Sequence, residues 1–101
     1  MRMLVDLDLP IEPFNTYVRD GSAGERIGKI LEDLKPEAVY FTEQDGQRGG
    51  ILILDVVSPS DVPRIAEPFF LTFNAEVRFH ICMTPDDLGN AGLEELGEKW
   101  G

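Results

Sequence analysis

Cysteine, histidine and tryptophan are almost absent from this chain, since each occurs once in 101 residues. A single cysteine cannot form a disulfide within the chain, so we expect the protein in the reducing cytoplasm. His80 and Cys82 lie two residues apart, but no further histidine or cysteine is present to complete a familiar metal site with them. We therefore expect neither a metal ion nor a cofactor.

Long apolar runs and basic residues are also scarce. No stretch approaches the ~20 apolar residues of a membrane-spanning helix, and the N-terminus lacks the pattern of a signal peptide, so we expect neither. Nine basic residues stand against nineteen acidic ones, which gives a formal net charge of −10. A field of that sign repels phosphate backbones and anionic lipid surfaces. The composition thus argues against nucleic acids and membranes as partners of this acidic protein.

The length favours a single domain over residues 1–101. Apolar residues make up 43% of the chain and charged residues 28%, which are the proportions of a globular protein. A domain of this size buries only ~60–70% of the surface that its unfolded chain exposes. Its core is therefore thin, and an oligomer that covers further apolar surface is expected.

Hydrophobic periodicity predicts the order of strands and helices. Alternating apolar residues indicate strands, and apolar residues three and four positions apart indicate helices. The expected elements are a strand over 2–9, a short helical segment over 15–18, a helix over 22–34, strands over 37–43 and 51–57 joined by a turn over 44–50, a helix from 58–61 to 73, a strand over 76–83 and a helical tail over 84–100.

Single residues predict where the helices begin, bend and weaken. Ser22 and Glu25 have the spacing of a capping box, and Thr84 followed by Pro85 is typical of a capped start. Pro68 lacks an N–H and clashes with the preceding turn, so a kink or a second short turn is expected there. Three glycines each weaken the tail by ~1 kcal/mol relative to alanine, so the tail should be helical only because it docks.

The predicted βαββαβ order indicates an α+β, ferredoxin-like fold, in which an antiparallel four-stranded sheet has helices on one face. A C-terminal helix follows. The odd-numbered residues of the first strand then face the helices, which leaves a mixed second face. That face holds Leu4, Asp6, Asp8, Tyr40, Thr42, Ile51, Ile53, Asp55, Arg78, His80 and Cys82. Its apolar members would be exposed in a monomer, which predicts a homodimer with a second sheet as the cover.

Several segments resemble an uncharacterised family of small bacterial proteins within the dimeric α/β-barrel, ferredoxin-like group. The matching segments are residues 18–21, 30–38, 40–42, 66–71, 73–75 and 83–88. The resemblance implies that two sheets pair face to face into a barrel. Some members of the wider group are cofactor-free monooxygenases or isomerases that bind small organic molecules between sheet and helices.

Five polar residues of the second face are candidate site residues: Asp6, Asp8, Tyr40, Arg78 and His80. They could form an acid/base pocket, but cross-strand and intersubunit pairing is the favoured interpretation. We therefore expect a homodimer of unassigned role that binds a small apolar organic ligand or interacts with a partner. The alternative is a cofactor-free enzyme that uses the five residues. A cavity of ~300 Å³ or more that reaches them would favour ligand chemistry.

Overall fold

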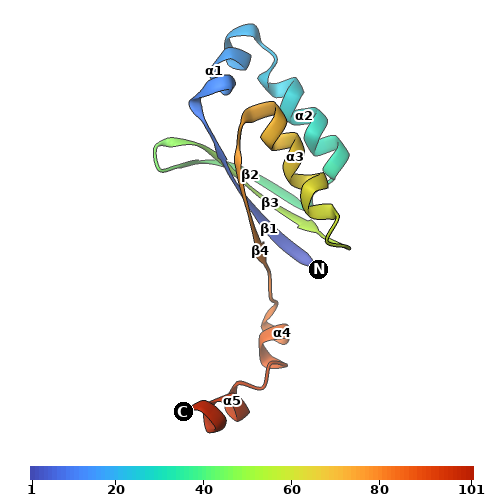
Figure 1. Ribbon diagram of the computed structural model, residues 1–101, viewed down its shortest axis with the longest axis vertical. Helices are drawn as coiled ribbons and strands as arrows, with labels where there is room; N and C mark the ends of the chain where they lie inside the picture. Colours follow the sequence, from blue (N-terminus) through green and yellow to red (C-terminus); the bar gives the residue numbers. More distant parts are fainter.

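A four-stranded antiparallel sheet, covered on one face by helices, forms the body of the molecule (Figure 1). The computed structural model describes residues 1–101. Its elements are β1 (Arg2–Leu9), α1 (Ile11–Asp20), α2 (Ala23–Leu34), β2 (Ala38–Gln44), β3 (Gln47–Asp55), α3 (Asp61–Phe73), β4 (Glu76–Ile81), α4 (Pro85–Gly89) and α5 (Leu93–Trp100). None of the helices combines the length and apolar character needed to cross a membrane.

The strand order β2-β3-β1-β4 is that of the predicted ferredoxin-like fold, which the structure confirms. The apolar strands β3 and β1 lie in the centre, and β2 and β4 form the edges. Along β1 the odd-numbered residues are buried and the even-numbered residues from Leu4 to Asp8 are half-buried. The predicted assignment of the two faces is therefore correct.

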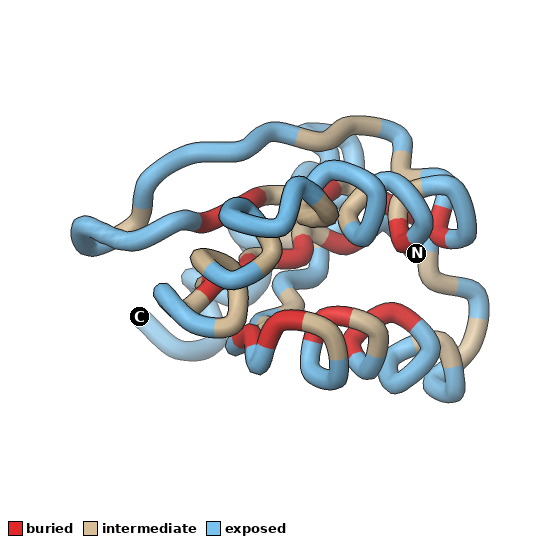
Figure 2. Tube along the Cα trace, turned by 90° about the horizontal axis from the view of Figure 1, so that it is seen from above, coloured by how far each residue is buried: buried red, intermediate tan, exposed pale blue.

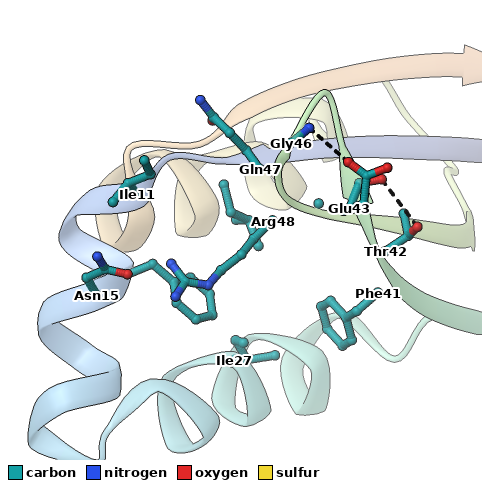
Figure 3. A pocket seen from close by; sticks show the side chains of 12 residues that line it. Ile11, Asn15, Ile27, Phe41, Thr42, Glu43, Gly46, Gln47 and Arg48 are labelled. Carbon is teal, nitrogen blue, oxygen red and sulfur yellow. Dashed lines mark hydrogen bonds between the residues drawn. The ribbon is translucent and has the colours of Figure 1, made fainter.

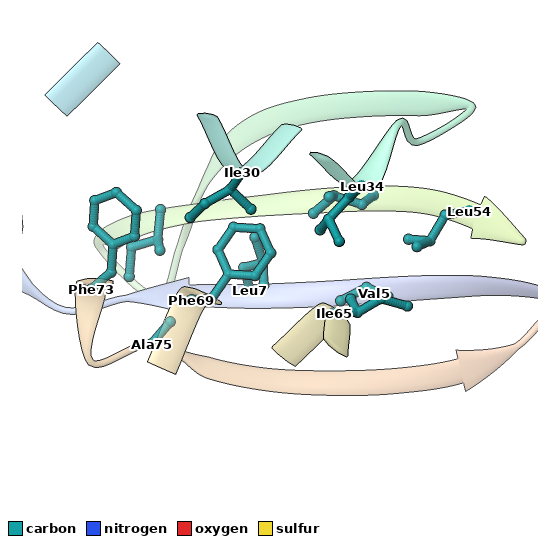
Figure 4. Packing of buried hydrophobic residues seen from close by; sticks show 11 residues of the cluster. Val5, Leu7, Ile30, Leu34, Leu54, Ile65, Phe69, Phe73 and Ala75 are labelled. Carbon is teal, nitrogen blue, oxygen red and sulfur yellow. The ribbon is translucent and has the colours of Figure 1, made fainter. Parts of the chain in front are cut away.

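The core lies between the sheet and helices α2 and α3 (Figure 4). Its eleven buried residues are Val5, Leu7, Leu9, Ile30, Leu34, Leu52, Leu54, Ile65, Phe69, Phe73 and Ala75. Helix α1 joins this core at one end through Phe14, whose ring stacks on Phe73 at 5.3 Å between centroids. The Tyr17 hydroxyl donates to the Thr72 carbonyl oxygen at 2.9 Å, which ties α1 to α3. Helix α1 is thus held by α3 beside the end of the sheet.

The β2–β3 hairpin is tighter than predicted. The expected seven-residue turn is wrong, because Asp45 and Gly46 alone connect the strands, with φ angles of 52° and 80°. Two central residues of positive φ are typical of the type I′ turn, whose twist matches that of paired strands. Gly49 and Gly50 consequently lie inside β3, where both are buried. Turn-like composition was misleading here because one Asp-Gly pair suffices to reverse the chain.

Two details of the helices differ from expectation. The Ser22 capping box does not form; its hydroxyl accepts from Arg26 Nε at 2.9 Å, and its N–H donates to the Asp20 carboxylate at 2.8 Å. Helix α3 runs through Pro68 without the predicted kink. Pro68 has no N–H to donate to the carbonyl of Arg64, so the helix lacks one backbone hydrogen bond there, next to an exposed residue.

The C-terminal arm, residues 82–101, extends away from the sheet (Figure 1). It contains the two short helices α4 and α5 rather than one, and neither has a buried residue. The predicted cap of α4 does form, since the Thr84 and Asp87 side chains each accept from the other residue's N–H. The prediction that the tail docks is wrong for its own domain, because Trp100 is 76% exposed. Figure 2 shows the burial confined to the sheet and its helices.

Candidate functional site

A cavity of about 780 Å³ opens between α1, α2 and the β2–β3 hairpin (Figure 3). Its apolar walls are Leu9, Ile11, Phe14, Ile27 and Phe41. Pro10 follows β1 directly, so α1 begins at the end of the sheet, and its residues Ile11 and Phe14 line the same cavity as the hairpin. On the other side Phe41 lies opposite Gly50, where an added Cβ would come within 3.3 Å of its ring. Glycine at this position therefore leaves room for one wall of the cavity.

Arg48 is the cation of this cavity. Its guanidinium carbon lies 4.5 Å from the centroid of the Phe14 ring, within the range of a cation–π contact. Arg48 has no ion pair. Glu43, its cross-strand neighbour, instead accepts a hydrogen bond from the Gly46 N–H at 2.8 Å. The guanidinium therefore stacks on one apolar wall with its hydrogen-bond donors free, in a cavity that Glu43 also lines. Free donors of a guanidinium suit an anionic ligand.

A second polar group, on the outer face of the sheet, surrounds Arg78. Its Nη2 lies 2.8 Å from an Asp8 carboxylate oxygen and 2.6 Å from one of Glu76, and its Nη1 lies 3.9 Å from Asp6. The hydrogen bond to Asp8, followed by the attraction of the same carboxylate, raises the pKa of Arg78 above its ordinary value. Gln44 reaches across β3 and donates to Asp6 at 2.6 Å. This group is therefore held together by complementary charge.

One acceptor of the outer face remains unused. The Asp8 Oδ1 atom is buried and has no hydrogen-bond partner. Gln44 can cross toward Asp6 because the intervening residue is Gly49, where a Cβ would approach the Gln44 Cγ to 2.7 Å. A buried acceptor without a donor is unusual in a native protein and calls for a physical explanation.

The structure brings together only three of the five predicted site residues. Asp6, Asp8 and Arg78 contact one another or share a partner, whereas Tyr40 lies on β2 and His80 on β4, at opposite edges of the sheet. Neither the Tyr40 hydroxyl nor the His80 ring forms a hydrogen bond. None of the five lines the large cavity. Their role in a site stays a prediction.

Sequence reasoning missed the residues of the cavity itself. Arg48 was assigned to the turn over 44–50, so its face was not considered. The available signal was the alternation of side chains along a strand. Leu52 and Leu54 of the same strand are buried on the helix-covered face, so Gly50 and Arg48, two and four residues before Leu52, lie on that face too. Phe14 stood in a segment with no clear hydrophobic period, and nothing local predicted its contact with Arg48.

Comparisons with known proteins concern the fold. No family model and no curated protein matches the chain. Among solved structures, it is similar to 5-chloro-2-hydroxyhydroquinone dehydrochlorinase of Burkholderia phenoliruptrix AC1100 in complex with 2,5-dihydroxybenzoquinone, with a TM-score of 0.60 and 17% identity over 85% of this chain and 97% of that chain. It also matches the de novo designed protein Ferredog-Diesel, with a TM-score of 0.46 and 13% identity over 80% and 85% of the two chains. The likeness to the dehydrochlorinase, together with the strand order, shows an α+β ferredoxin-like fold.

Proposed function

We propose that this protein is a homodimer that binds a small, planar organic anion in the cavity between α1, α2 and the hairpin. The observation that supports this most directly is Arg48, whose guanidinium stacks on Phe14 without a carboxylate partner at an apolar cavity. A guanidinium can hold a carboxylate or a similar pair of oxygens through two parallel hydrogen bonds. The aromatic walls suit the flat part of the same ligand.

The size of the cavity supports a ligand of this class. About 780 Å³ lies within the ~300–1,000 Å³ that small-molecule sites occupy. Because the chain carries a net charge of −10, its overall field opposes an approaching anion, so the local attraction must come from Arg48. The structurally similar dehydrochlorinase is named for a hydroxylated aromatic ring and was solved with a dihydroxyquinone, which is also planar and rich in oxygen. This supports a ligand of that shape for the same fold.

The homodimer part of the proposal rests on the outer face of the sheet. Leu4, Ile51 and Ile53 are only half-buried there, and Tyr40 is largely exposed. A second sheet on this face would cover these side chains, as the predicted α/β barrel requires.

A cofactor-free enzyme of the outer face is the second candidate function. It is favoured by one observation, the Asp8 Oδ1 atom without a partner, because this oxygen could take a proton from a substrate once a rearrangement of the side chain exposed it. Asp6, Arg78, Tyr40 and His80 would surround that substrate between the paired sheets. Turnover that Asp8→Asn abolishes while ligand binding persists would favour this candidate over simple binding.

The binding proposal is tested with benzoate and with benzamide, its neutral isostere, in NMR titrations of the protein. We expect the wild type to prefer benzoate, with shifts at Phe14 and Phe41. Arg48→Met should weaken benzoate binding by about 10- to 100-fold, since a hydrogen bond to a charged group contributes ~1.5–3 kcal/mol. Arg48→Lys should retain part of the affinity because it keeps the charge without the planar fork.

Arg26 provides the matched control, because its guanidinium also stacks on an aromatic ring, that of Tyr17 at 3.9 Å, but lies outside the cavity. Arg26→Met should leave benzoate binding unchanged. An equal loss in both Met variants would show a general effect of charge, and equal affinity for benzoate and benzamide would show that no anion site exists.

A further inference from the structure

The chain exposes more surface than a compact monomer of its mass. Its accessible surface is 6888 Å², whereas an 11.3 kDa monomer is expected to expose about 5,700 Å². Its radius of gyration is 17.1 Å, against about 13 Å for a compact domain of this length. The excess of about 1,200 Å² exceeds the ~800 Å² that each partner contributes to a standard interface. The excess exposed area is thus large enough to form the interface of a stable dimer.

The C-terminal arm accounts for this extended shape, and its exposed surface includes an apolar stripe. Leu93, Leu96 and Trp100 follow at i, i+3 and i+7 on α5, which places them on one face of the helix. All three are exposed, as is Leu88 on α4. A stripe of this kind normally packs against another apolar surface.

The helices of the arm are too short to be stable by themselves. α4 has five residues and α5 has eight, whereas isolated helices shorter than about 12–15 residues are marginal in water. Gly97 weakens α5 further because it lies in the helix interior. The arm's own domain provides no buried contact to either helix. An ordered arm therefore needs the surface of another molecule.

We propose that α4 and α5 pack on a second copy of this chain, so that the homodimer exchanges its C-terminal arms. The arm leaves from the end of β4, an edge strand of the sheet whose outer face is the proposed interface. Ile81 and Met83, at this junction, are both exposed, although Ile81 pairs with Met3 and therefore lies on the helix-covered face of β4. Each arm therefore starts at the rim of that interface, within reach of the second copy. The proposal rests on the homodimer proposed above.

Trp100 makes the proposal measurable in the full chain, because it is the only tryptophan. At micromolar concentration, light scattering should give twice the 11.3 kDa chain mass, and the emission of Trp100 should be blue-shifted. Dilution to the monomer should return the emission to that of tryptophan in water. A sample of mixed isotope-labelled and unlabelled chains should show intermolecular NOEs from the Trp100 ring.

The variant Leu93→Ser/Leu96→Ser removes most of the stripe without touching the core. It should weaken dimerisation at least tenfold while the NMR spectrum of residues 1–81 keeps its native dispersion. Glu94→Gln/Glu98→Gln, on the same helix, changes only polar positions and should keep the dimer. A wild-type dimer with water-like emission would overturn the arm exchange and leave the dimer intact. A monomer with blue-shifted emission at every concentration would overturn both, because the arm would then fold on its own domain.

Discussion

Arg48 and Arg78 are the same residue type on the same sheet, yet their surroundings differ completely. Arg78 lies within 4 Å of three carboxylates on the outer face. Arg48, on the opposite face, has no carboxylate partner and stacks on a ring. The Arg78 guanidinium offsets the charges of neighbouring carboxylates, which would otherwise repel one another. The Arg48 guanidinium is free to attract a ligand. Strand register decides which face of the sheet each arginine lies on.

At this scale we predict that Arg78→Met lowers the melting temperature by a few degrees near neutral pH. The variant keeps much of the apolar stem but leaves Asp6, Asp8 and Glu76 to repel one another. Arg64→Met is the control: its side chain is 45% exposed, against 46% for Arg78, but it pairs with a single carboxylate. Thermal unfolding followed by circular dichroism should show a clearly smaller change for Arg64→Met. Equal changes would show that the cluster around Arg78 contributes nothing special.

The β2–β3 hairpin is the element that builds most of the cavity. Its two-residue turn extends the pairing of the strands back to Gln44 and Gln47. That extension places Arg48 opposite Leu9 and Glu43, beside α1. A longer loop at this point would leave Arg48 outside the sheet and the cavity without its cation.

We predict opposite effects for alanine at two glycines. Gly46→Ala should destabilise the fold by about 1–2 kcal/mol, because Gly46 has a φ of 80°, which an L side chain adopts only with strain. Gly28→Ala should stabilise it by up to ~1 kcal/mol, since Gly28 lies inside α2 with open space at the added Cβ. Urea unfolding measures both. A neutral Gly46→Ala would mean that the turn adopts another conformation in solution.

At the scale of the whole molecule, charge opposes the assembly that the apolar surfaces favour. Each copy brings a net charge of −10 into the dimer, so the two copies repel each other at long range. The arm adds to this repulsion, because its helices hold five acidic residues and one lysine. Salt should therefore strengthen association.

We predict that dimerisation tightens several-fold between about 0.01 M and about 0.15 M sodium chloride, because the screening length falls from about 30 Å to about 8 Å. Sedimentation equilibrium at both concentrations measures the effect. Sucrose at matched osmolarity should not reproduce it. A dimer that weakens with salt would show instead that ion pairs across the interface outweigh the repulsion of net charge.

The fold was predictable from the sequence because it depends on local periodicity and element order. The alternation in β1 predicted both of its faces, and the βαββαβ order predicted the strand order. The site was only partly predictable. The contacts among Asp6, Asp8 and Arg78 follow from strand pairing in this topology, whereas a role for these residues in a site stays a prediction. Tyr40 and His80 share that face but lie on opposite edge strands, too far apart to act in one site. The alternation of side chains along a strand shows which face a residue lies on, but not its distance from residues on other strands.

The sequence by itself determined three features. It determined which residues face the core and at which residue α4 begins with a cap. It also determined that a monomer would leave apolar surface uncovered. Only the tertiary structure decided that Arg48 meets Phe14, because this contact joins segments whose approach depends on hairpin register and on the packing of α1 against α3. It also decided that the arm leaves its own domain. Hydrophobic periodicity and secondary-structure propensity depend on a few neighbouring residues, whereas a cavity is formed by segments that are distant in the chain.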